Sequence, residues 1–411
     1  MNIARPRSYV VALVGLLVLL WGSVGLNRLG LGLILPNLRS EFGIDNLQAG
    51  LLVAGTSITW AFASWGGGWL SDHYGRRLVL LPAMAFICLM TAAMGLAGGF
   101  WSMFIIRDLL GVGDGIGWSV GEATIGEEVP ARWRGVSQAV FTAGYTLIGA
   151  GLGAIIITRL TKQFGWHWAF PVIAAATAVV VIALWTLMRE PVQRRPHSAA
   201  DWRSAVGLLR NPSLVLLTVM GCAILSWLQV FALFDHSFLL RIRHFDEADA
   251  GEIAAFWGFA GAAGAVVLPL TSDFVGRRPV VLLAALVSAA TLAVYLFAGL
   301  DKGMMQLVLG VSGFCGFGLL PIVLATCVSE AVAENERGAA LGVTNFFGVI
   351  VGTTVMPILA GKLADSAGLV AALVIPIAAQ VAVMLLILGI GETAPRVLAR
   401  GAAPALRRRP A

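Results

Sequence analysis

Charged residues are scarce in this chain of 411 residues. They make up 12% of the sequence, whereas hydrophobic residues make up 58%. Soluble domains usually carry roughly 25% charged residues. A folded chain with so few charges cannot cover a water-facing surface with polar groups, so the composition excludes an ordinary soluble protein and predicts one that lies in a membrane.

Candidate metal ligands and catalytic clusters are also scarce. The four cysteines all fall inside apolar runs, and neither metal-ligand nor disulfide spacing is present. The five histidines are dispersed, and no nucleotide-binding loop occurs. We therefore expect no enzyme, no metal and no cofactor, and the energy for any work must come from gradients.

Long apolar runs fill most of the chain. A membrane-spanning helix needs roughly 20 apolar residues, and lipid offers no hydrogen-bond partner to an open backbone. Twelve helical spans are predicted, at about 9–36, 46–70, 78–98, 101–126, 135–159, 166–188, 212–240, 251–271, 280–299, 303–331, 339–363 and 367–390. The first run is too long for a cleavable signal peptide.

A polar, Arg-rich segment divides these spans six and six. It carries Pro191 and Pro196, and we interpret it as a linker. The predicted organisation is a six-helix bundle at 1–188, a linker at 189–211, a second six-helix bundle at 212–391 and an Arg-rich tail at 392–411. We expect the chain to act as a monomer.

Basic residues are distributed unevenly between the loops. One alternating set of segments, which includes both termini and the linker, holds 19 lysines and arginines, and the other set holds 7. Basic loops stay on the cytoplasmic side, so both termini are predicted to be cytoplasmic, in a bacterial inner membrane. This asymmetry accounts for the net charge of +6 without a nucleic-acid partner. The tail could touch anionic membrane lipid, although a topology signal explains it more simply.

One short charged loop occurs twice. Residues 67–77 read GGWLSDHYGRR, and residues 268–278 read LPLTSDFVGRR. Each copy lies between two long apolar runs, at matching places in the two halves. A duplicated membrane unit of this kind is typical of a transporter whose halves rock about a central site.

The first copy resembles the loop between helices 2 and 3 of the major facilitator superfamily. The second copy departs at Pro269, where the family has Gly. The resemblance covers nearly the whole chain, and it implies an all-α membrane protein with twelve transmembrane helices in two pseudo-symmetric six-helix bundles. It also implies that the loops latch the halves together on the cytoplasmic side. That role falls on Gly68, Asp72, Gly75, Arg76, Arg134, Asp273, Gly276 and Arg277.

The chemistry expected of the first loop is local. Gly68 would permit close helix contact and Gly75 a tight turn, while Asp72 would face the positive end of a helix dipole. A loop that only sets topology would explain Arg76 and Arg77 but not the aspartate or the glycines.

Two arginines lie inside predicted spans, where a charge is costly and usually functional. Arg28 and Arg107 both fall in the outer half of the first bundle. Two guanidinium groups facing one cleft would repel each other without an anion between them, and the planar guanidinium suits a carboxylate. The alternatives are snorkelling at a helix end or pairing of Arg107 with Asp108, which points about 100° away around the helix.

Acidic residues follow Arg107 on the same helix. Asp114 comes seven residues later, on the same face and about 10 Å deeper. Desolvation there favours a protonated carboxyl, so we expect Asp114 to couple transport to protons. Glu122, two turns further on, is the second candidate, near the cytoplasmic end.

Arg28, Arg107 and Asp114, with Gly111 and the Pro130/Arg134/Gly135 segment, resemble the pattern of the anion:cation symporter family, which carries sugar acids and other organic anions. The sequence departs from it at Asn27, where the family commonly has an acid, and at Asp114, commonly Glu. These departures affect the expected proton stoichiometry more than they affect the expected binding of an anion. Asn27 joins the predicted substrate site.

The second half is nearly free of such charges. The position that matches Arg28 is Gln229, so we expect neutral hydrogen-bonding groups there, with Ser226, Gln229, Thr344 and Asn345 as candidates and Trp227, Phe231 and Phe346 as an apolar wall. Asp235 and His236 are interpreted as a solvated helix end, with a gate as the alternative. The glycines at 144–153 weakly resemble a drug:proton antiporter motif, but Ala150 replaces its proline, which favours helix packing.

The pattern predicts a secondary transporter that imports a small organic anion with protons by alternating access. The alternatives left open are an organic anion exchanger, a proton-driven efflux antiporter of amphipathic compounds and a non-transporting sensor of a bound anion.

Overall fold

The structure, a computed structural model, describes residues 6–190, 206–395, 397 and 398, and the regular elements in these residues are all helical. The first half contains α1 (Arg7–Phe42), α2 (Asn46–Tyr74), α3 (Arg76–Met94), α4 (Phe100–Glu128), α5 (Ala131–Gly144), η1 (Tyr145–Leu152), α6 (Gly153–Phe164) and α7 (Trp166–Leu187).

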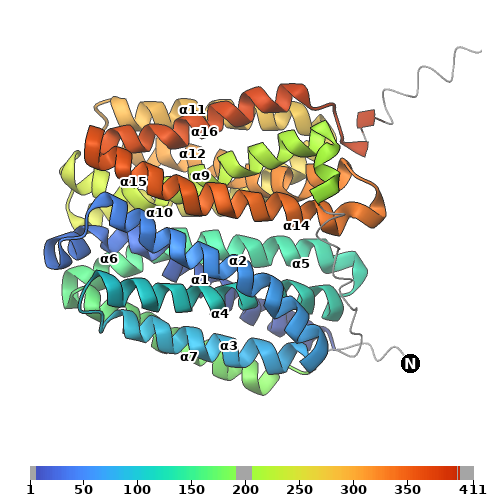
Figure 1. Cartoon of the computed structure of the whole chain (residues 1–411), viewed down its shortest axis with the longest axis horizontal. Helices are drawn as coiled ribbons and strands as arrows, with labels where there is room; N and C mark the ends of the chain where they lie inside the picture. Colours follow the sequence, from blue (N-terminus) through green and yellow to red (C-terminus); the bar gives the residue numbers. More distant parts are fainter. Residues whose placement is uncertain (1–5, 191–205, 396, 399–411) are drawn as a thin grey trace, which may run out of the picture.

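The second half follows after η2 (Leu208–Arg210). It contains α9 (Pro212–Arg241), α10 (Glu247–Val275), α11 (Arg277–Phe297), α12 (Lys302–Pro321), η3 (Ile322–Thr326), α13 (Cys327–Glu330), η4 (Glu334–Glu336), α14 (Arg337–Phe347), η5 (Gly348–Val355), α15 (Met356–Ala367), α16 (Leu369–Leu386) and η6 (Ile387–Gly389). The two halves lie side by side (Figure 1). Most of the predicted linker and of the Arg-rich tail lies outside the described residues.

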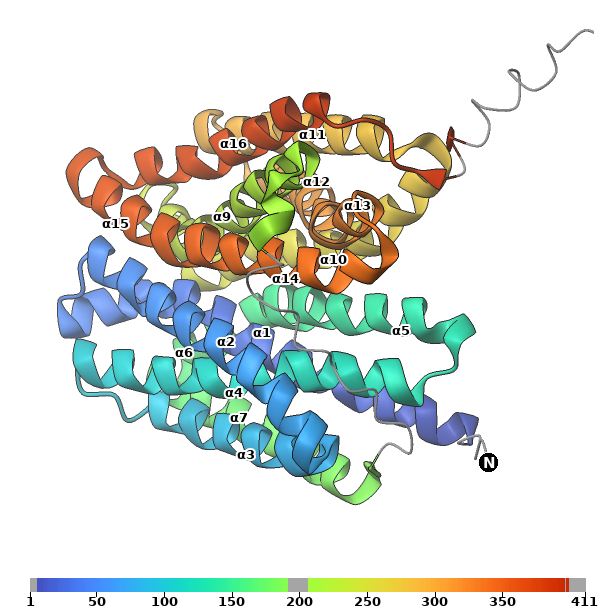
Figure 2. The same cartoon turned by 45° about the vertical axis from the view of Figure 1, so that its right-hand side comes forward.

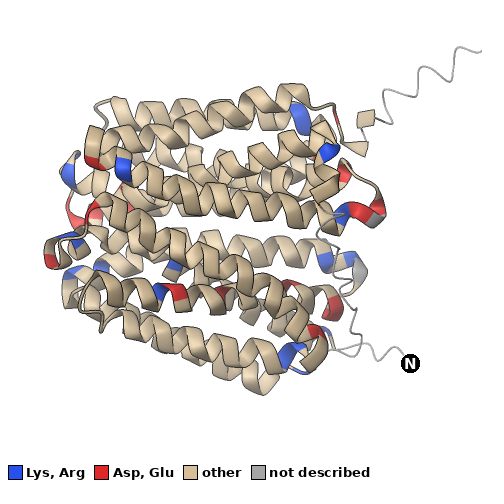
Figure 3. Ribbon diagram, in the orientation of Figure 1, with Lys and Arg blue, Asp and Glu red and all other residues tan. Residues whose placement is uncertain are grey.

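Within the described residues, eleven helices are long and apolar enough to cross a membrane, counting α5–η1–α6, α12–η3–α13 and α14–η5–α15 as one span each. The twelfth predicted span is α4, which has 29 residues but carries Arg107, Asp108 and Asp114 in its middle. Figure 3 shows that charged residues otherwise gather at the two ends of the bundle. The predicted all-helical membrane fold is therefore confirmed, and α4 is the span whose composition is least apolar.

Three spans contain a π-helical stretch where the sequence predicted uninterrupted α-helix. η1 and η5 occupy matching places in the two halves, 203 residues apart at Tyr145 and Gly348. Insertions of this kind are frequent at functional sites because they free backbone groups and redirect side chains. The pattern of apolar residues does not reveal them.

Glycines bring helices into close contact, both within the first half and between the halves. A Cβ on Gly149 would lie 2.7 Å from backbone atoms of Gly25 on α1, and one on Gly151 would lie 2.6 Å from the Phe259 ring on α10. The helix-packing interpretation of this glycine cluster is confirmed, because backbones approach closely only where side chains are small.

The halves meet along α1 with α9, α10 with η1 and α6, and α2 with η5 and α15 (Figure 2). We call the end with the α1–α2, α6–α7 and α9–α10 loops the closed face, and the opposite end, where α1 begins, the terminal face. At the closed face, ion pairs join the halves: Arg159 Nη2 lies 3.3 Å from Glu252 Oε1, and Lys162 Nζ lies 3.1 Å from Asp246 Oδ2.

Candidate functional site

Arg107 on α4 is almost fully buried, with 2% of its surface exposed. Its Nη1 donates to the carbonyl of Asn27 on α1 at 3.3 Å, and its Nε donates to the carbonyl of Leu52 on α2 at 3.4 Å. Both bonds are long and both acceptors are neutral. The structure therefore holds the guanidinium among three helices and leaves its charge without an ion pair among the described residues.

Asp108 does not neutralise Arg107. Its Oδ1 lies against Gly55 on α2, and this buried atom has no hydrogen-bond partner among the described residues. The prediction that Asp108 is a poor partner for Arg107 is confirmed, since adjacent residues on a helix point in different directions.

Arg28 on α1 contacts α2, one of the helices that surround Arg107. Its guanidinium is half-buried, donates from Nη2 to Ser57 Oγ on α2 at 3.4 Å and lies 5.4 Å from the ring centroid of Trp60. A cation over an aromatic face is stabilised without losing its charge. Ser57 and Trp60 were missed by the sequence reasoning, because each lies in an ordinary apolar run.

Asp114 connects the two arginines electrostatically. Its carboxyl is fully buried on α4, neither oxygen has a hydrogen-bond partner among the described residues, and it interacts electrostatically with both Arg28 and Arg107. The structure thus brings together the three charged residues selected from the sequence. A single carboxyl can neutralise only one of the two positive charges.

Two further polar groups border this cluster. Asn27, next to Arg28, is buried and both atoms of its side-chain amide lack a partner among the described residues. Tyr145, the first residue of η1, interacts electrostatically with Arg28, Arg107 and Asp114. Tyr145 was missed because a lone tyrosine in an apolar span looks like packing.

Glu122 lies on α4 two turns beyond Asp114 and is half-buried. It forms no ion pair within the described part of the chain. Its location towards the terminal face separates it from the arginine cluster.

The second half contributes differently from what the sequence predicted. Trp227 is fully buried and packs on Trp257 and Phe317, with ring centroids 5.3 Å apart in both pairs. It thus packs in the aromatic core of the second half. Gln229 is buried, and Asn345 is half-buried with Nδ2 bonded to its own helix at Leu341. Neither forms a hydrogen bond with Arg28 or Arg107 among the described residues.

The duplicated loops form matching clusters at the terminal face. In the first half, Arg76 pairs with Asp72 at 2.6 Å and with Glu127 at 2.8 Å, and it also bonds Ser71. The backbone nitrogens of Arg76 and Arg77 donate to the Glu190 carboxylate, which thereby caps α3. Glu190 therefore occupies the N-terminus of α3, where Asp72 was expected to face the positive end of a helix dipole.

The second half repeats this arrangement. Arg277 pairs with Asp273 at 2.5 Å and with Glu330 at 3.0 Å. Burial alone would raise the pKa of the Glu392 carboxyl, but hydrogen bonds from backbone nitrogens, including those of Arg277 and Arg278, hold it below its ordinary value. Glu127 and Glu330 are thus the matching ion-pair partners of Arg76 and Arg277.

The glycines of the two loops divide into two kinds. Gly75 and Gly276 have positive φ values of 106° and 120°, which agrees with the tight turn predicted there. Gly68 does not mediate helix contact in this conformation, because a Cβ there would meet no atom within 4 Å; the contact is made by Gly67, buried against Ile116. Arg134 donates to the carbonyl of Val129 at 3.4 Å.

Comparison with known proteins gives a consistent result. The chain is 26% identical over 333 residues to a probable 4-methylmuconolactone transporter of Cupriavidus pinatubonensis, covering 78% of this chain and 76% of that protein. It is 27% identical over 371 residues to a hexuronate transporter of Bacillus subtilis, covering 84% and 85%.

A solved structure shares the fold. A bacterial homologue of the human lysosomal transporter spinster, in an inward-facing and unoccupied conformation, aligns with a TM-score of 0.77 at 14% identity, over 93% of this chain and 98% of that one. Residues 17–352 match the family model described as Major Facilitator Superfamily. The chain is therefore a multi-pass membrane protein that belongs to the Major Facilitator Superfamily of transporters.

Proposed function

We propose that this protein imports a small organic anion, a carboxylate, together with protons. The observation that supports this most is the imbalance of charge at the centre of the first half: Arg28 and Arg107 face one buried carboxyl, Asp114, and neither arginine is ion-paired among the described residues. A carboxylate ligand would restore neutrality. The guanidinium group can hold it with two parallel hydrogen bonds.

Proton coupling follows from the same three charges. A proton on Asp114 removes the internal counter-ion and leaves two positive charges, which increases the attraction for an anion. By linkage, a bound anion increases the attraction of Asp114 for a proton to the same extent. Substrate and proton would then bind together and leave together as the halves rock. Asn27, Gln229 and Asn345 would contact the neutral part of the ligand, and Glu122 would relay the proton towards the terminal face.

The names of the relatives support this class of substrate. One is named as a hexuronate transporter, and a hexuronate carries one carboxylate on a sugar. We place the protein in a bacterial inner membrane with the terminal face in the cytoplasm, because the basic loops lie there. In that orientation the ion pairs of the closed face seal the outside.

An exchanger of organic anions is the second candidate. Asn27 favours it, because this neutral amide stands beside Arg28 where the related symporters have an acid. An exchanger would bind the anion at the same arginines but would need no net proton movement.

Transport by purified protein in liposomes separates these two functions. We expect an inward proton gradient to accumulate galacturonate above its external concentration, and galactose, which lacks the carboxylate, to remain at equilibrium. Counterflow of galacturonate without proton-driven accumulation would assign the exchanger. Equal transport of galacturonate and galactose would refute an anion site.

A further inference from the structure

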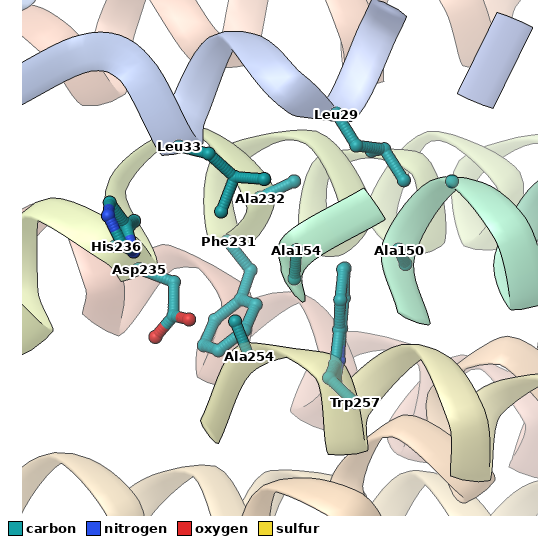
Figure 4. A pocket seen from close by; sticks show the side chains of 11 residues that line it. Leu29, Leu33, Ala150, Ala154, Phe231, Ala232, Asp235, His236, Ala254 and Trp257 are labelled. Atoms are coloured by element: carbon teal, nitrogen blue, oxygen red, sulfur yellow. The ribbon is translucent and has the colours of Figure 1, made fainter. Parts of the chain in front are cut away.

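A second acidic site lies in the other half, between the halves and close to the closed face. A small cavity of about 30 Å³ is lined by α1, η1, α6, α9 and α10. Figure 4 shows Asp235, Phe231 and Trp257 on one side of it, with Leu29 and Leu33 from α1 and Ala150 and Ala154 on the other. A cavity of this size holds a water molecule and excludes an organic solute.

Asp235 is buried here, with 4% of its surface exposed, and this contradicts the expectation of a solvated helix end. Its Oδ1 accepts a hydrogen bond of 2.6 Å from the Tyr295 hydroxyl on α11. No ion pair to Asp235 is found among the described residues. Burial without a nearby cation disfavours the charged form of a carboxyl, even where a neutral group donates a hydrogen bond to it. A carboxyl in this setting favours binding a proton.

His236 supplies a second, independent observation. It is 1% exposed, and its Nδ1 has no hydrogen-bond partner among the described residues although the side chain lines the cavity. Its Nε2 lies 3.2 Å from Oε1 of Glu247, the first residue of α10, whose side chain is 20% exposed at the closed face. Trp257 also lines the cavity, and its Nε1 has no hydrogen-bond partner in the part of the chain that the structure describes. These groups give a water in the cavity the polar partners that it requires.

The other groups near Asp235 leave its charge uncompensated. Arg243 lies in the α9–α10 loop, but its Nη2 donates to the backbone carbonyls of Tyr295, Leu296 and Ala298. The segments α1, η1 and α6 present only apolar side chains to the cavity. A metal cation would need several oxygen ligands, and this lining supplies too few, so the chemistry favours a proton.

We propose that Asp235 is a second proton-binding site, in the second half, which exchanges its proton with the outside through His236 and Glu247. This inference rests on the proposed proton-coupled function. The cavity is formed by both halves, so separation of α1, η1 and α6 from α9 and α10 would open Asp235 to outside water. Closure would bury the proton that it had accepted. His236 and Tyr295 are positioning residues in this scheme.

Infrared difference spectroscopy of the purified protein tests the site without any substrate. Between about pH 8 and pH 5, where a perturbed carboxyl titrates, we expect the C=O stretch of a protonated carboxylic acid to appear. Asp235→Asn should remove one component of this band and leave the contribution of Asp114, whereas Asp301→Asn, which alters a helix cap at the same face, should keep the full band. Tyr295→Phe should shift the band to higher frequency because the carboxyl loses its hydrogen bond. A full band in Asp235→Asn would overturn the proposal, and so would a band that sodium removes at constant pH.

Coupling is tested in liposomes with the membrane potential clamped to zero and galacturonate as the probe. Asp235→Asn should lose one coupled proton. Its accumulation of galacturonate should therefore fall about tenfold for each unit of pH gradient, while counterflow persists. An unchanged dependence on the gradient would show that the proton at Asp235 is not coupled and would overturn the proposal. If the wild-type protein accumulates no galacturonate, the proposed function fails, and the infrared result still decides whether Asp235 binds a proton.

Discussion

The carboxylate of Asp365, near the end of α15, accepts a 3.1 Å hydrogen bond from the backbone nitrogen of Asn46, the first residue of α2. The same carboxylate accepts from the backbone nitrogen of Leu47 at 2.9 Å. A residue of the second half thus caps a helix of the first half, and it does so at the positive end of the helix dipole. This contact exists only while the closed face is closed.

Removal of this cap should favour opening of the closed face. Asp365 is exposed, so we expect Asp365→Ala to shift the balance between the two conformations about twofold to fivefold, which corresponds to about 0.5–1 kcal/mol. Distances between spin labels at the ends of α2 and α15 measure this balance. Ser366→Ala is the matched control, because the hydrogen bonds of the Ser366 hydroxyl among the described residues stay within its own helix. Equal distance distributions in both variants would refute a cross-half cap.

Replacement of either central arginine by lysine should impair uptake. Arg28→Lys and Arg107→Lys keep the positive charge but lose the two-pronged contact, and a hydrogen bond to a charged group is worth about 1.5–3 kcal/mol. We expect a loss of roughly 10- to 100-fold in the ratio of maximal uptake rate to half-saturating concentration. Arg159→Lys, an exposed residue that pairs at the closed face, controls for the substitution itself. Normal uptake by both central variants would end the anion-site hypothesis.

Asp114→Asn should lose one coupled proton, which lowers the accumulation driven by a pH gradient, and should preserve counterflow. The amide keeps the shape of the side chain but cannot take up a proton, and the two arginines remain to bind the anion. Proton flux and labelled galacturonate measured in the same liposomes check both parts. Asp114 would lose its role if the variant carried as many protons per anion as the wild-type protein.

Asp72→Asn should slow transport several-fold with little effect on the affinity for galacturonate. Asp72 is ion-paired with Arg76 in a buried cluster at the terminal face, far along the bundle from the central arginines, so a change there should alter the conformational step alone. Rates of uptake and equilibrium binding, measured on the same preparation, separate the two effects. A large loss of affinity would argue against a latch.

The pH dependence of transport should not come from the Lys162–Asp246 pair. Backbone hydrogen bonding from Asp249 and the Lys162 ammonium lower the pKa of Asp246 below its ordinary value, which is about 3.9. The stabilisation is therefore fully present above that value and is lost only as the pH falls through the lowered pKa. We expect Lys162→Met to change the conformational balance equally at about pH 8 and about pH 5. An effect at pH 8 that disappears at pH 5 would contradict this assignment.

The local properties of the chain could be predicted from its sequence. Apolar runs of sufficient length gave the spans, and the cost of a charge in lipid selected Arg28, Arg107 and Asp114, which the structure places together. Properties that depend on contacts between distant segments could not be predicted. The partners Glu127 and Glu330, about 50 residues from their arginines, belong to this group, as does the burial of Asp235 against the other half.

The π-helical stretches explain a further difference. They rotate the residues that follow them relative to a regular α-helix, so the apolar pattern does not predict which side chains of these spans face the centre. The prediction that Gly68 permits close helix contact was wrong for a related reason. Two adjacent glycines are equivalent in the sequence, and only the packing of α2 on α4 shows that Gly67 makes the contact.

Direct binding to the purified protein tests the central claim that Arg28 and Arg107 hold a carboxylate. Calorimetric titration would compare galacturonate, benzoate and succinate, each with its uncharged amide. We predict that at least one acid binds, that its amide does not bind measurably, and that Arg28→Lys and Arg107→Lys each weaken the acid while Arg159→Lys does not. Binding of acid and amide with equal affinity, or an affinity that both central variants leave unchanged, would contradict the account.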